Sequence, residues 1–542
     1  MNSLLLVLIG FICLALGYLV YGQRLARLFD VSPSRPTPAH SKYDGVDYVP
    51  AKNWLVLFGH HFSSIAGAGP ILGPVIACAI WGWGPAILWI IIGSIFLGGV
   101  LDFSSLMISI REGGNSISDT AKSTLGIRIK IIFSLFIWLT LILVIAVFAA
   151  SAAKTLQTTP QIVIPTFGII PLAIITGIML YRWKINTVIA TAIGLLIFLG
   201  LVILGWYLPI KGSYHLWLIL LLVFYAFTAS ILPVNIILQP RDYLSFFVLI
   251  IGILLGFIGL LITHPKINTP IFVSLNSKEG FLLPMMFVTI ACGAISGFHS
   301  LVASGTTSKQ LNNERDAQRI GYGAMLVEGF LSLFAVAVVC AGLFWYGGPA
   351  GLIYPELIKG GNWISAFGKG YGEVTKPILG VLGMFIGITM LKTFIVTTLD
   401  TATRITRYIG TELFGEQFKI GFMKNMYINS LIVIGLATLL AFGAWQSIWP
   451  IFGASNQLVA ALALLIITAW LLTKEKQIKY VIYPAVFMLL VTISALIYQI
   501  VIFIPAHKYL LSAIAIILLI IAGFMIWETV KHWYLFRKAK TS

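Results

Sequence analysis

Two interruptions rich in glycine, proline and serine stand inside very apolar stretches of this sequence. One covers residues 59–74 and contains His60 and His61, and the other covers 291–307 and contains His299. A helix that faces lipid cannot break, because no water is present to bond the freed N–H and C=O groups. A break at membrane depth therefore lies inside protein or lines a wet cavity, and transporters place substrate and ion sites at such breaks.

Acidic side chains inside the apolar stretches are a second chemical signal. Asp102, Glu328, Asp400 and Glu528 lie within or at the edge of apolar segments. A charge at the centre of a membrane helix costs about 2.5–3.5 kcal/mol on insertion scales, so each acid requires a partner or a function. For Asp102 the alternatives are an ion or proton site and a hydrogen-bonded structural acid, whereas Glu528 is expected to reach the interface.

A polar helix face runs from Lys392 to Arg404. Asp400 and Arg404 are four residues apart, which favours a local ion pair. Lys392 lies about two turns deeper in the span. There it could bind a substrate carboxylate or neutralise an acid on another helix, such as Glu328.

The composition indicates a polytopic membrane protein. Of the 542 residues, 59% are hydrophobic and 10% are charged, whereas a soluble domain has about 25% charged residues. The net charge of +17 does not indicate nucleic-acid binding, because the cations lie in short loops and no basic face with interleaved aromatic residues is present. The surrounding partner is therefore membrane lipid, and the sequence leaves the oligomeric state open.

About 20 apolar residues cross the hydrocarbon core as a helix, and the sequence predicts about 15 such spans. They are 3–21, 54–80, 84–110, 131–153, 162–180, 185–207, 215–237, 243–263, 283–303, 319–346, 377–402, 425–443, 447–472, 480–503 and 509–530. With the N-terminus outside, 26 lysines and arginines fall on the inside and 8, Lys278 among them, on the outside. This asymmetry predicts a cytoplasmic C-terminus.

The two longest loops carry further expectations. The inside loop 22–53 contains several prolines, which predicts an extended chain. The outside loop 347–376 is rich in glycine and could act as a lid.

Motifs for other function classes are missing from the sequence. No phosphate-binding loop, nucleophile elbow or zinc-protease motif is present, and Cys13, Cys78, Cys292 and Cys340 do not have the spacing of a zinc site. No metal or cofactor is predicted beyond a coupling ion, H⁺ or Na⁺. These features indicate a secondary transporter and not an enzyme, with a channel, a membrane sensor and an intramembrane enzyme as the alternatives.

Several long motifs, in order along the chain, resemble the carbon starvation protein A family of inner-membrane transporters. They are 44–50 (DGVDYVP), 59–62 (GHHF), 65–70 (IAGAGP), 73–74 (GP), 102–103 (DF), 111–114 (REGG), 232–233 (LP), 239–244 (QPRDYL), 291–299 (ACGAISGFH), 399–404 (LDTATR) and 449–458 (WPIFGASNQL). The resemblance implies uptake of pyruvate or peptides across the inner membrane, under carbon starvation.

The resemblance also implies kinship with the amino acid–polyamine–organocation superfamily. Its fold is an all-α, five-plus-five inverted repeat like that of the leucine transporter, with discontinuous helices. We expect 1–53 to form an extra helix and loop, 54–402 the ten-helix core and 403–542 the C-terminal helices. In this mapping 54–80 is the first core helix and 215–237, interrupted at Pro233, is the sixth. The eighth, 283–303, brings serine and threonine residues to a position that often binds sodium in this fold.

The breaks and the buried charges predict a cation-coupled importer, and the resemblance implies a small carboxylate such as pyruvate as its substrate, with peptide or amino-acid uptake as the alternative. Half-helix N-termini near the first break present a positive dipole end to a carboxylate. Close helix packing through small residues is the other interpretation of these glycines. The expected substrate-binding residues are His61, Ser64, Gly67, Ala68, Gly69, Thr228, Ser230, Asn235 and Lys392. The expected ion-coupling residues are Asp102, His299, Ser300, Ser304, Thr306 and Asp400.

Overall fold

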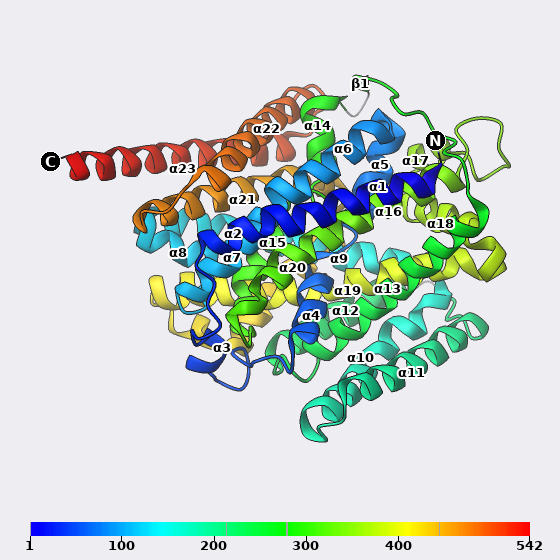
Figure 1. Ribbon diagram of the computed structural model, residues 1–542, viewed down its shortest axis with the longest axis horizontal. Helices are drawn as coiled ribbons and strands as arrows, with labels where there is room; N and C mark the ends of the chain where they lie inside the picture. The colour runs from blue at the N-terminus through cyan, green and yellow to red at the C-terminus, as the bar shows by residue number, and fades with distance from the viewer. Residues whose placement is uncertain (1, 213, 278–279, 444, 542) are drawn as a thin grey trace.

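The computed structural model describes residues 2–212, 214–277, 280–443 and 445–541, so Lys278 lies outside the described residues. Helices that run roughly along the long axis make up most of the molecule, and the two chain ends lie at opposite ends of this bundle (Figure 1). The described strands are two short ones, β1 (Asn276–Ser277) and β2 (Gly280–Phe281), which pair antiparallel in the connection between residues 263 and 282.

Among the described residues, eleven helical segments are long and apolar enough to cross a membrane, or up to twelve if one bent pair counts as a span. The eleven are Ser3–Leu28, Trp83–Arg111, Ile127–Thr158, Pro160–Arg182, Thr187–Tyr207, Leu238–Thr263, Glu314–Gly342, Trp363–Gln417, Ile451–Thr473, Lys479–Phe503 and Tyr509–Tyr534. Two shorter apolar helices, α12 (His215–Ile231) and α20 (Met426–Gly443), lie between them. The protein is therefore an all-α, multi-pass membrane protein, and the number of 15 spans stays a prediction.

The helices have the following bounds. They are α1 (Ser3–Leu16), α2 (Gln23–Leu28), α3 (Pro38–Ser41), α4 (Trp54–Ile65), α5 (Gly69–Trp81), α6 (Trp83–Gly93), α7 (Gly99–Arg111), α8 (Ile117–Thr124), α9 (Ile127–Thr158), α10 (Val163–Gly177), α11 (Thr187–Tyr207), α13 (Leu238–Thr263), α14 (Leu282–Thr289), α15 (Gly297–Gly305), α16 (Ala324–Gly342), α17 (Tyr354–Lys359), α18 (Trp363–Leu379), α19 (Gly383–Gly410), α21 (Trp445–Thr473), α22 (Lys479–Phe503) and α23 (Tyr509–Thr541). Two π-helical segments, η1 (Gly17–Gly22) and η2 (Ser94–Gly98), continue α1 and α6.

The first predicted interruption is present. Helices α4 and α5 are bent by 44° at residues 66–68. The Asn53 side chain caps α4, and Pro70 occupies the first turn of α5, where its missing N–H leaves no helical hydrogen bond unmade. A Cβ atom added at Gly69 would lie 2.5 Å from the Cys292 sulfur, so glycine is required here for close approach of the two interrupted regions.

The second interruption lies between α14 and α15, over residues 290–296. Ser296 is the N-cap residue of α15, and the Asn456 side chain of α21 accepts a hydrogen bond from the Phe298 N–H at 2.9 Å. A polar side chain from a neighbouring helix therefore satisfies one backbone group freed by the break, as burial at membrane depth requires.

The predicted discontinuous helix over 215–237 is wrong in that form. Helix α12 ends at Ile231, residues 232–237 form turns, and α13 begins at Leu238. Leu232 is extended, with φ −74° and ψ 151°, because the residue before a proline is disfavoured in the helical region. The break at Pro233 thus separates two helices, and the five-plus-five repeat stays a prediction.

Three other boundaries differ from the expectations. The first helix continues through η1 and α2 to Leu28, and the rest of the inside loop contains the short helix α3. The predicted outside loop 347–376 contains α17 and most of α18, which turns at Gly380 (φ 54°) to pack against α19. The core boundary expected at residue 402 falls inside α19.

Candidate transport site

His299, at the start of α15, lies between two buried carboxylates. Its Nδ1 atom is 3.2 Å from Asp102 Oδ2 on α7, and its Nε2 atom is 3.3 Å from Glu328 Oε2 on α16. All three side chains have no exposed surface. We call these residues the His299 triad. It joins two of the predicted ion-coupling residues to Glu328, which the sequence could not place.

Hydrogen bonding in the triad is incomplete. Only the His299–Asp102 contact has hydrogen-bond geometry. In the part of the chain that the structure describes, Asp102 Oδ1 and both Glu328 oxygens have no hydrogen-bond partner. If the imidazole is protonated and both carboxylates are ionised, the triad still has one net negative charge. A net charge in a buried place is costly. This arrangement can lower its energy by taking up a further proton.

A second buried cluster, the Arg241 network, consists of His60, Tyr225, Arg241, Asp242 and Asp400. The Arg241 guanidinium donates to Asp400 Oδ2 at 2.5 Å and to Asp242 Oδ1 at 2.7 Å. The other Asp242 oxygen lies 2.6 Å from His60 Nδ1, and Tyr225 donates to Asp400 at 2.6 Å. Tyr225 also contacts Arg241 directly. The network thus ties α4, α12, α13 and α19 together.

Every carboxylate oxygen in the Arg241 network has a hydrogen bond. Asp400 Oδ1 accepts from Arg241 at 3.2 Å, and His60 Nε2 lies 2.7 Å from the Thr306 hydroxyl. Thr306, predicted to take part in ion coupling, therefore belongs to this network. The expected local pair of Asp400 with Arg404 is wrong, because Asp400 pairs with Arg241 instead.

The first break brings polar groups of α4 and α19 together. The Ser64 hydroxyl donates to the His60 carbonyl at 2.7 Å and lies 3.1 Å from the Thr401 hydroxyl. Thr398 donates to the Ser64 carbonyl at 3.3 Å, next to Gly67. His61 points its Nδ1 atom at the Thr307 hydroxyl, 2.8 Å away. Its buried Nε2 atom has no partner among the described residues.

Gly67 and Ala68 lie in the break itself, Ala68 is the N-cap residue of α5, and Gly69 is the first residue of α5. The hydroxyl hydrogens of Ser300 and Ser304 are donated to carbonyls of α15, each at 2.7 Å. The Ser304 oxygen also accepts a hydrogen bond from the Ile117 N–H of α8 at 3.1 Å, and neither serine side chain bonds to the triad.

Three predicted substrate residues lie around the end of α12, and two of them form hydrogen bonds away from the break at 66–68. Thr228 donates to Phe224 O of its own helix at 2.9 Å, and Ser230 donates to Ser430 of α20 at 3.1 Å. The Asn235 side-chain oxygen is buried in the turn that follows and has no partner among the described residues. The structure therefore does not bring these residues to the break at 66–68 by hydrogen bonds.

Lys392 is buried on α19, with 1% of its surface exposed. Its Nζ atom donates to the Ser151 carbonyl of α9 at 3.4 Å. No carboxylate lies within ion-pair distance of it in the described ranges. The suggested pairing with Glu328 is wrong, because Glu328 faces His299. Lys392 is thus a buried amine with no carboxylate partner among the described residues.

The 44–50 motif, which lies outside the membrane spans, forms a third cluster with residues near the end of α19. The Asp47 carboxylate accepts hydrogen bonds from Arg404 at 2.5 Å, Arg407 at 2.8 Å and Tyr408 at 2.7 Å. Burial alone would raise the pKa of Asp47, but the Arg407 and Arg404 guanidiniums prevail and hold it well below its usual range. Burial lowers the pKa of the neighbouring Lys309 to about 8, against the opposing effect of Glu412 and Asp47.

Sequence reasoning missed four residues of the Arg241 network. Of its members only Asp400 is an expected site residue; for His60 the sequence leaves proton coupling and a satisfied interior histidine as alternatives, and it places Tyr225 within an apolar span and Arg241 among the inside charges. Arg241 in fact lies in the first turn of α13 and is 1% exposed. The available signal was the adjacent pair Arg241–Asp242, which begins the long apolar stretch of α13.

Comparison with known proteins defines the family. The family model described as "Carbon starvation protein CstA" matches residues 2–377 and 364–495. The "Peptide transporter CstA" of Bacillus subtilis is 33% identical over 514 residues, covering 86% of this chain and 85% of that protein. The "Pyruvate/proton symporter BtsT" of Escherichia coli is 33% identical over 574 residues, covering 89% and 79% respectively.

One solved structure, a manganese transporter of Eremococcus coleocola, has a TM-score of 0.49 and 10% identity over 92% of this chain and 99% of its own. That likeness is too weak to place a site or a substrate. The family assignment therefore rests on the family model and on the two relatives, and on both grounds this chain belongs to the carbon starvation protein CstA family.

Proposed function

We propose that this protein imports a small carboxylate such as pyruvate and couples the uptake to a proton gradient. The observation that carries the proposal is the His299 triad, a buried, under-bonded group of two acids and one histidine at the start of a half-helix. Buried ionisable groups of this kind form proton relays in transporters. The relative named as a pyruvate/proton symporter supports the same substrate and the same ion.

The substrate side of the proposal rests on Lys392 and the first break. A carboxylate beside Lys392 would supply the negative charge that the described structure does not place there. The half-helix α5 begins at Gly69 and adds a positive dipole end, which contributes about 0.3–1 kcal/mol, or up to ~2 when partly buried. Because the dipole alone is weak, the lysine is the main anchor in this scheme.

Proton coupling follows from the charge of the triad. A proton taken up by Glu328 or Asp102 removes the net negative charge, and its loss restores that charge. The two states therefore differ in the energy of burial, which biases α15 and α16 toward different positions. We place the transport core in residues 54–402, the N-terminus outside and the C-terminus in the cytoplasm.

Peptide uptake is the second candidate, favoured by the name of the Bacillus subtilis relative. A peptide zwitterion requires an acid for its α-amine as well as a cation for its carboxylate. A triad carboxylate would then bind substrate, so peptide and proton would compete for one group.

The test uses the purified full-length protein in proteoliposomes with labelled pyruvate. An inward proton gradient is expected to drive uptake above the level without a gradient, and a sodium gradient is not. Unlabelled dipeptides in excess should leave the uptake unchanged.

Each other result points to a different conclusion. Uptake driven only by sodium would overturn proton coupling, and inhibition by dipeptides would favour the peptide transporter. If labelled pyruvate does not accumulate under either gradient while the protein remains folded, the carboxylate proposal fails.

A further inference from the structure

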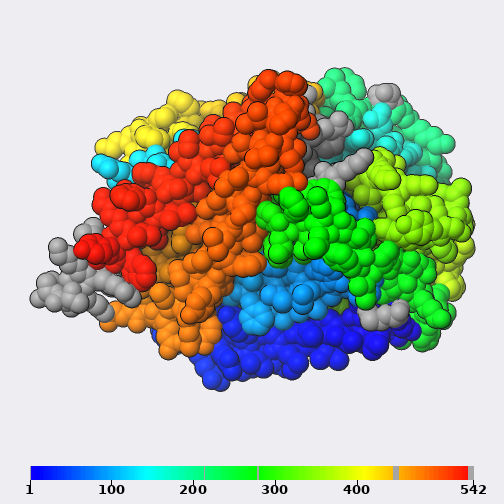
Figure 2. All heavy atoms as spheres, turned by 90° about the horizontal axis from the view of Figure 1, so that it is seen from above, coloured from blue at the N-terminus to red at the C-terminus, as the bar shows by residue number. Residues whose placement is uncertain are grey.

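A groove opens on the outer surface of the bundle, where the first helix, the α6–α7 span and α22 meet. Figure 2 shows these three segments, in blue, light blue and orange, on one face of the molecule. The groove has a volume of about 280 Å³, and none of its lining residues belongs to the His299 triad or the Arg241 network. Any binding in this groove is therefore independent of the proposed transport function.

Two π-helical segments shape this groove. Tyr21 comes from η1, and Phe96 and Leu97 come from η2. The segments approach closely, because a Cβ atom added at Gly17 would lie 2.7 Å from the Ile95 side chain. The Tyr21 and Phe96 rings meet edge to face at 5.0 Å.

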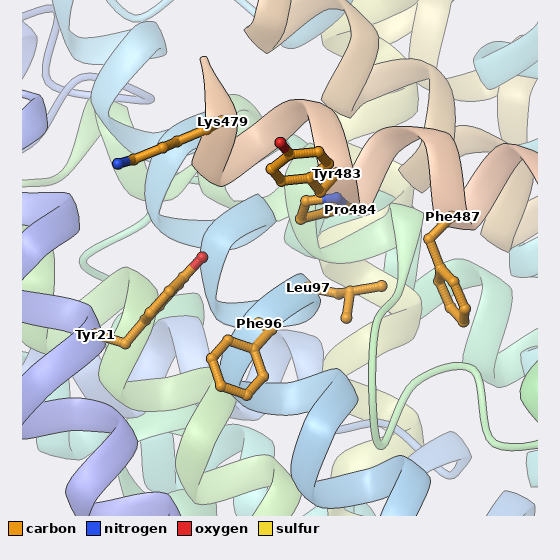
Figure 3. Close-up of a pocket in the computed structure, with 7 residues that line it drawn as sticks. All are labelled: Tyr21, Phe96, Leu97, Lys479, Tyr483, Pro484 and Phe487. Carbon is orange, nitrogen blue, oxygen red and sulfur yellow. The ribbon is translucent and has the colours of Figure 1, made fainter. Parts of the chain in front are cut away.

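The body of the groove is apolar and faces outward. Leu97 forms a buried floor at 6% exposure, whereas Phe96 and Phe487 are 43% and 38% exposed. Lys479 begins α22 and Phe487 lies eight residues further on, which spans about 12 Å along a helix. Figure 3 shows Lys479 and Tyr21 toward one end of the groove and Phe487 toward the other. This long apolar shape suits an acyl chain better than a compact solute.

The polar end of the groove is positively charged. Lys479 and Arg24 are both exposed, and neither forms an ion pair among the described residues. Lys479 lines the groove, and Arg24 follows the lining residue Tyr21 by three residues in the continuous helical segment Ser3–Leu28, which places Arg24 and Tyr21 on the same helix face. Both cations belong to the inside by the distribution of loop charges, where anionic headgroups attract basic side chains.

We propose that this groove binds one anionic phospholipid. An acyl chain lies along Phe96, Leu97 and Phe487, and the phosphate group lies between Lys479 and Arg24. The bound lipid joins the first helix to α22, so that two peripheral helices are held against the α6–α7 span.

The test is a lipid titration of the full-length protein in detergent, followed by native mass spectrometry. The probes are phosphatidylglycerol, phosphatidylcholine and the chain-free headgroup glycerophosphoglycerol. The double variant Arg24→Gln, Lys479→Gln is compared with Lys122→Gln, Lys424→Gln, which removes two exposed inside cations that do not line the groove. Melting temperatures without lipid verify that both variants fold.

Wild-type protein is expected to retain one phosphatidylglycerol more tightly than phosphatidylcholine. The groove variant should bind phosphatidylglycerol about 30-fold more weakly, from the loss of two basic contacts, while the control variant binds as the wild type does. Equal retention of phosphatidylglycerol by the groove variant and the control variant would overturn the proposal. So would effective competition by glycerophosphoglycerol, which would show an anion site without an acyl chain.

Discussion

The Arg241 network and the His299 triad each join a histidine to two fully buried carboxylates, but they differ in hydrogen bonding. In the network, Arg241, Tyr225 and His60 supply a partner to every carboxylate oxygen of Asp242 and Asp400. In the triad, three carboxylate oxygens have no hydrogen-bond partner among the described residues. A satisfied cluster holds helices in one arrangement, whereas an unsatisfied one has capacity to bind something more.

This difference teaches how to assign function to buried charges in a membrane protein. An acid inside a span is a candidate functional residue by default, and by that rule Asp102 and Asp400 looked alike. The comparison separates them, since Asp400 is saturated by Arg241 and Tyr225 and Asp102 is not. The predictions below test whether the separation holds.

The largest expected effect is a loss of stability when the cation of the Arg241 network is removed. Arg241→Gln leaves two buried carboxylates without their cation, which destabilises a protein by about 3–5 kcal/mol. We expect most of the protein to be lost from the folded, monodisperse fraction, with a strongly lowered melting temperature in detergent. Arg182→Gln, at an exposed position, is the control and should match the wild type. A well-folded Arg241→Gln protein would show that the network does not hold the helices.

Asp47 is a carboxylate outside the membrane spans that, like Asp400, accepts several hydrogen bonds. It therefore allows the same comparison to be made at a site where the pH can be varied. Asp47→Asn removes charged hydrogen bonds to Arg404 and Arg407, which is expected to cost about 1.5–3 kcal/mol. Because the folded pKa of Asp47 lies below its unfolded value, the stabilisation is present above about pH 4 and is lost only as the pH falls through the folded pKa. The melting difference from the wild type should therefore be constant between about pH 5 and 6, below the pH range in which the neighbouring Lys309 loses its proton.

Glu416→Gln, which changes an exposed acid near the same end of α19, is the control for Asp47→Asn. A melting difference for Asp47→Asn that varied between about pH 5 and 6 would contradict the assignment of Asp47 as a fully ionised structural acid.

Glu328→Gln tests the His299 triad, the cluster in which three carboxylate oxygens have no hydrogen-bond partner among the described residues. The substitution keeps the shape and removes one buried, unbonded charge, so we expect the melting temperature to be unchanged or raised. Proton-driven pyruvate uptake should fall about tenfold, which is a typical size for the coupling between two sites. Exchange of external for internal pyruvate should persist. Glu356→Gln, an exposed acid in α17, is the matched control. Loss of folding together with transport would place Glu328 among the structural acids.

Thr306→Val gives the smallest expected effect and tests to which cluster Thr306 belongs. The variant loses the hydroxyl contact to His60, while Gln310 remains 3.1 Å from the same ring nitrogen. A loss of about 1 kcal/mol in stability is expected, with the proton dependence of uptake unchanged. A shifted proton dependence at wild-type stability would move Thr306 to the ion-coupling residues.

The sequence by itself determined the class of the protein, the family motifs and the first break. Apolar length, loop charge and the glycine–proline spacing at 59–74 are local properties, and they predict helices and interruptions directly. It also identified Asp102, His299 and Asp400 as chemically important, because a charge in an apolar segment is unusual wherever the segment lies.

Only the tertiary structure decided which charges meet. The local spacing favoured Asp400 with Arg404, but helix packing placed Arg241 against Asp400 and Asp47 against Arg404. It also placed Glu328 beside His299 instead of Lys392. Pairing between distant helices depends on how they are rotated and packed together, and no spacing along one helix contains that information.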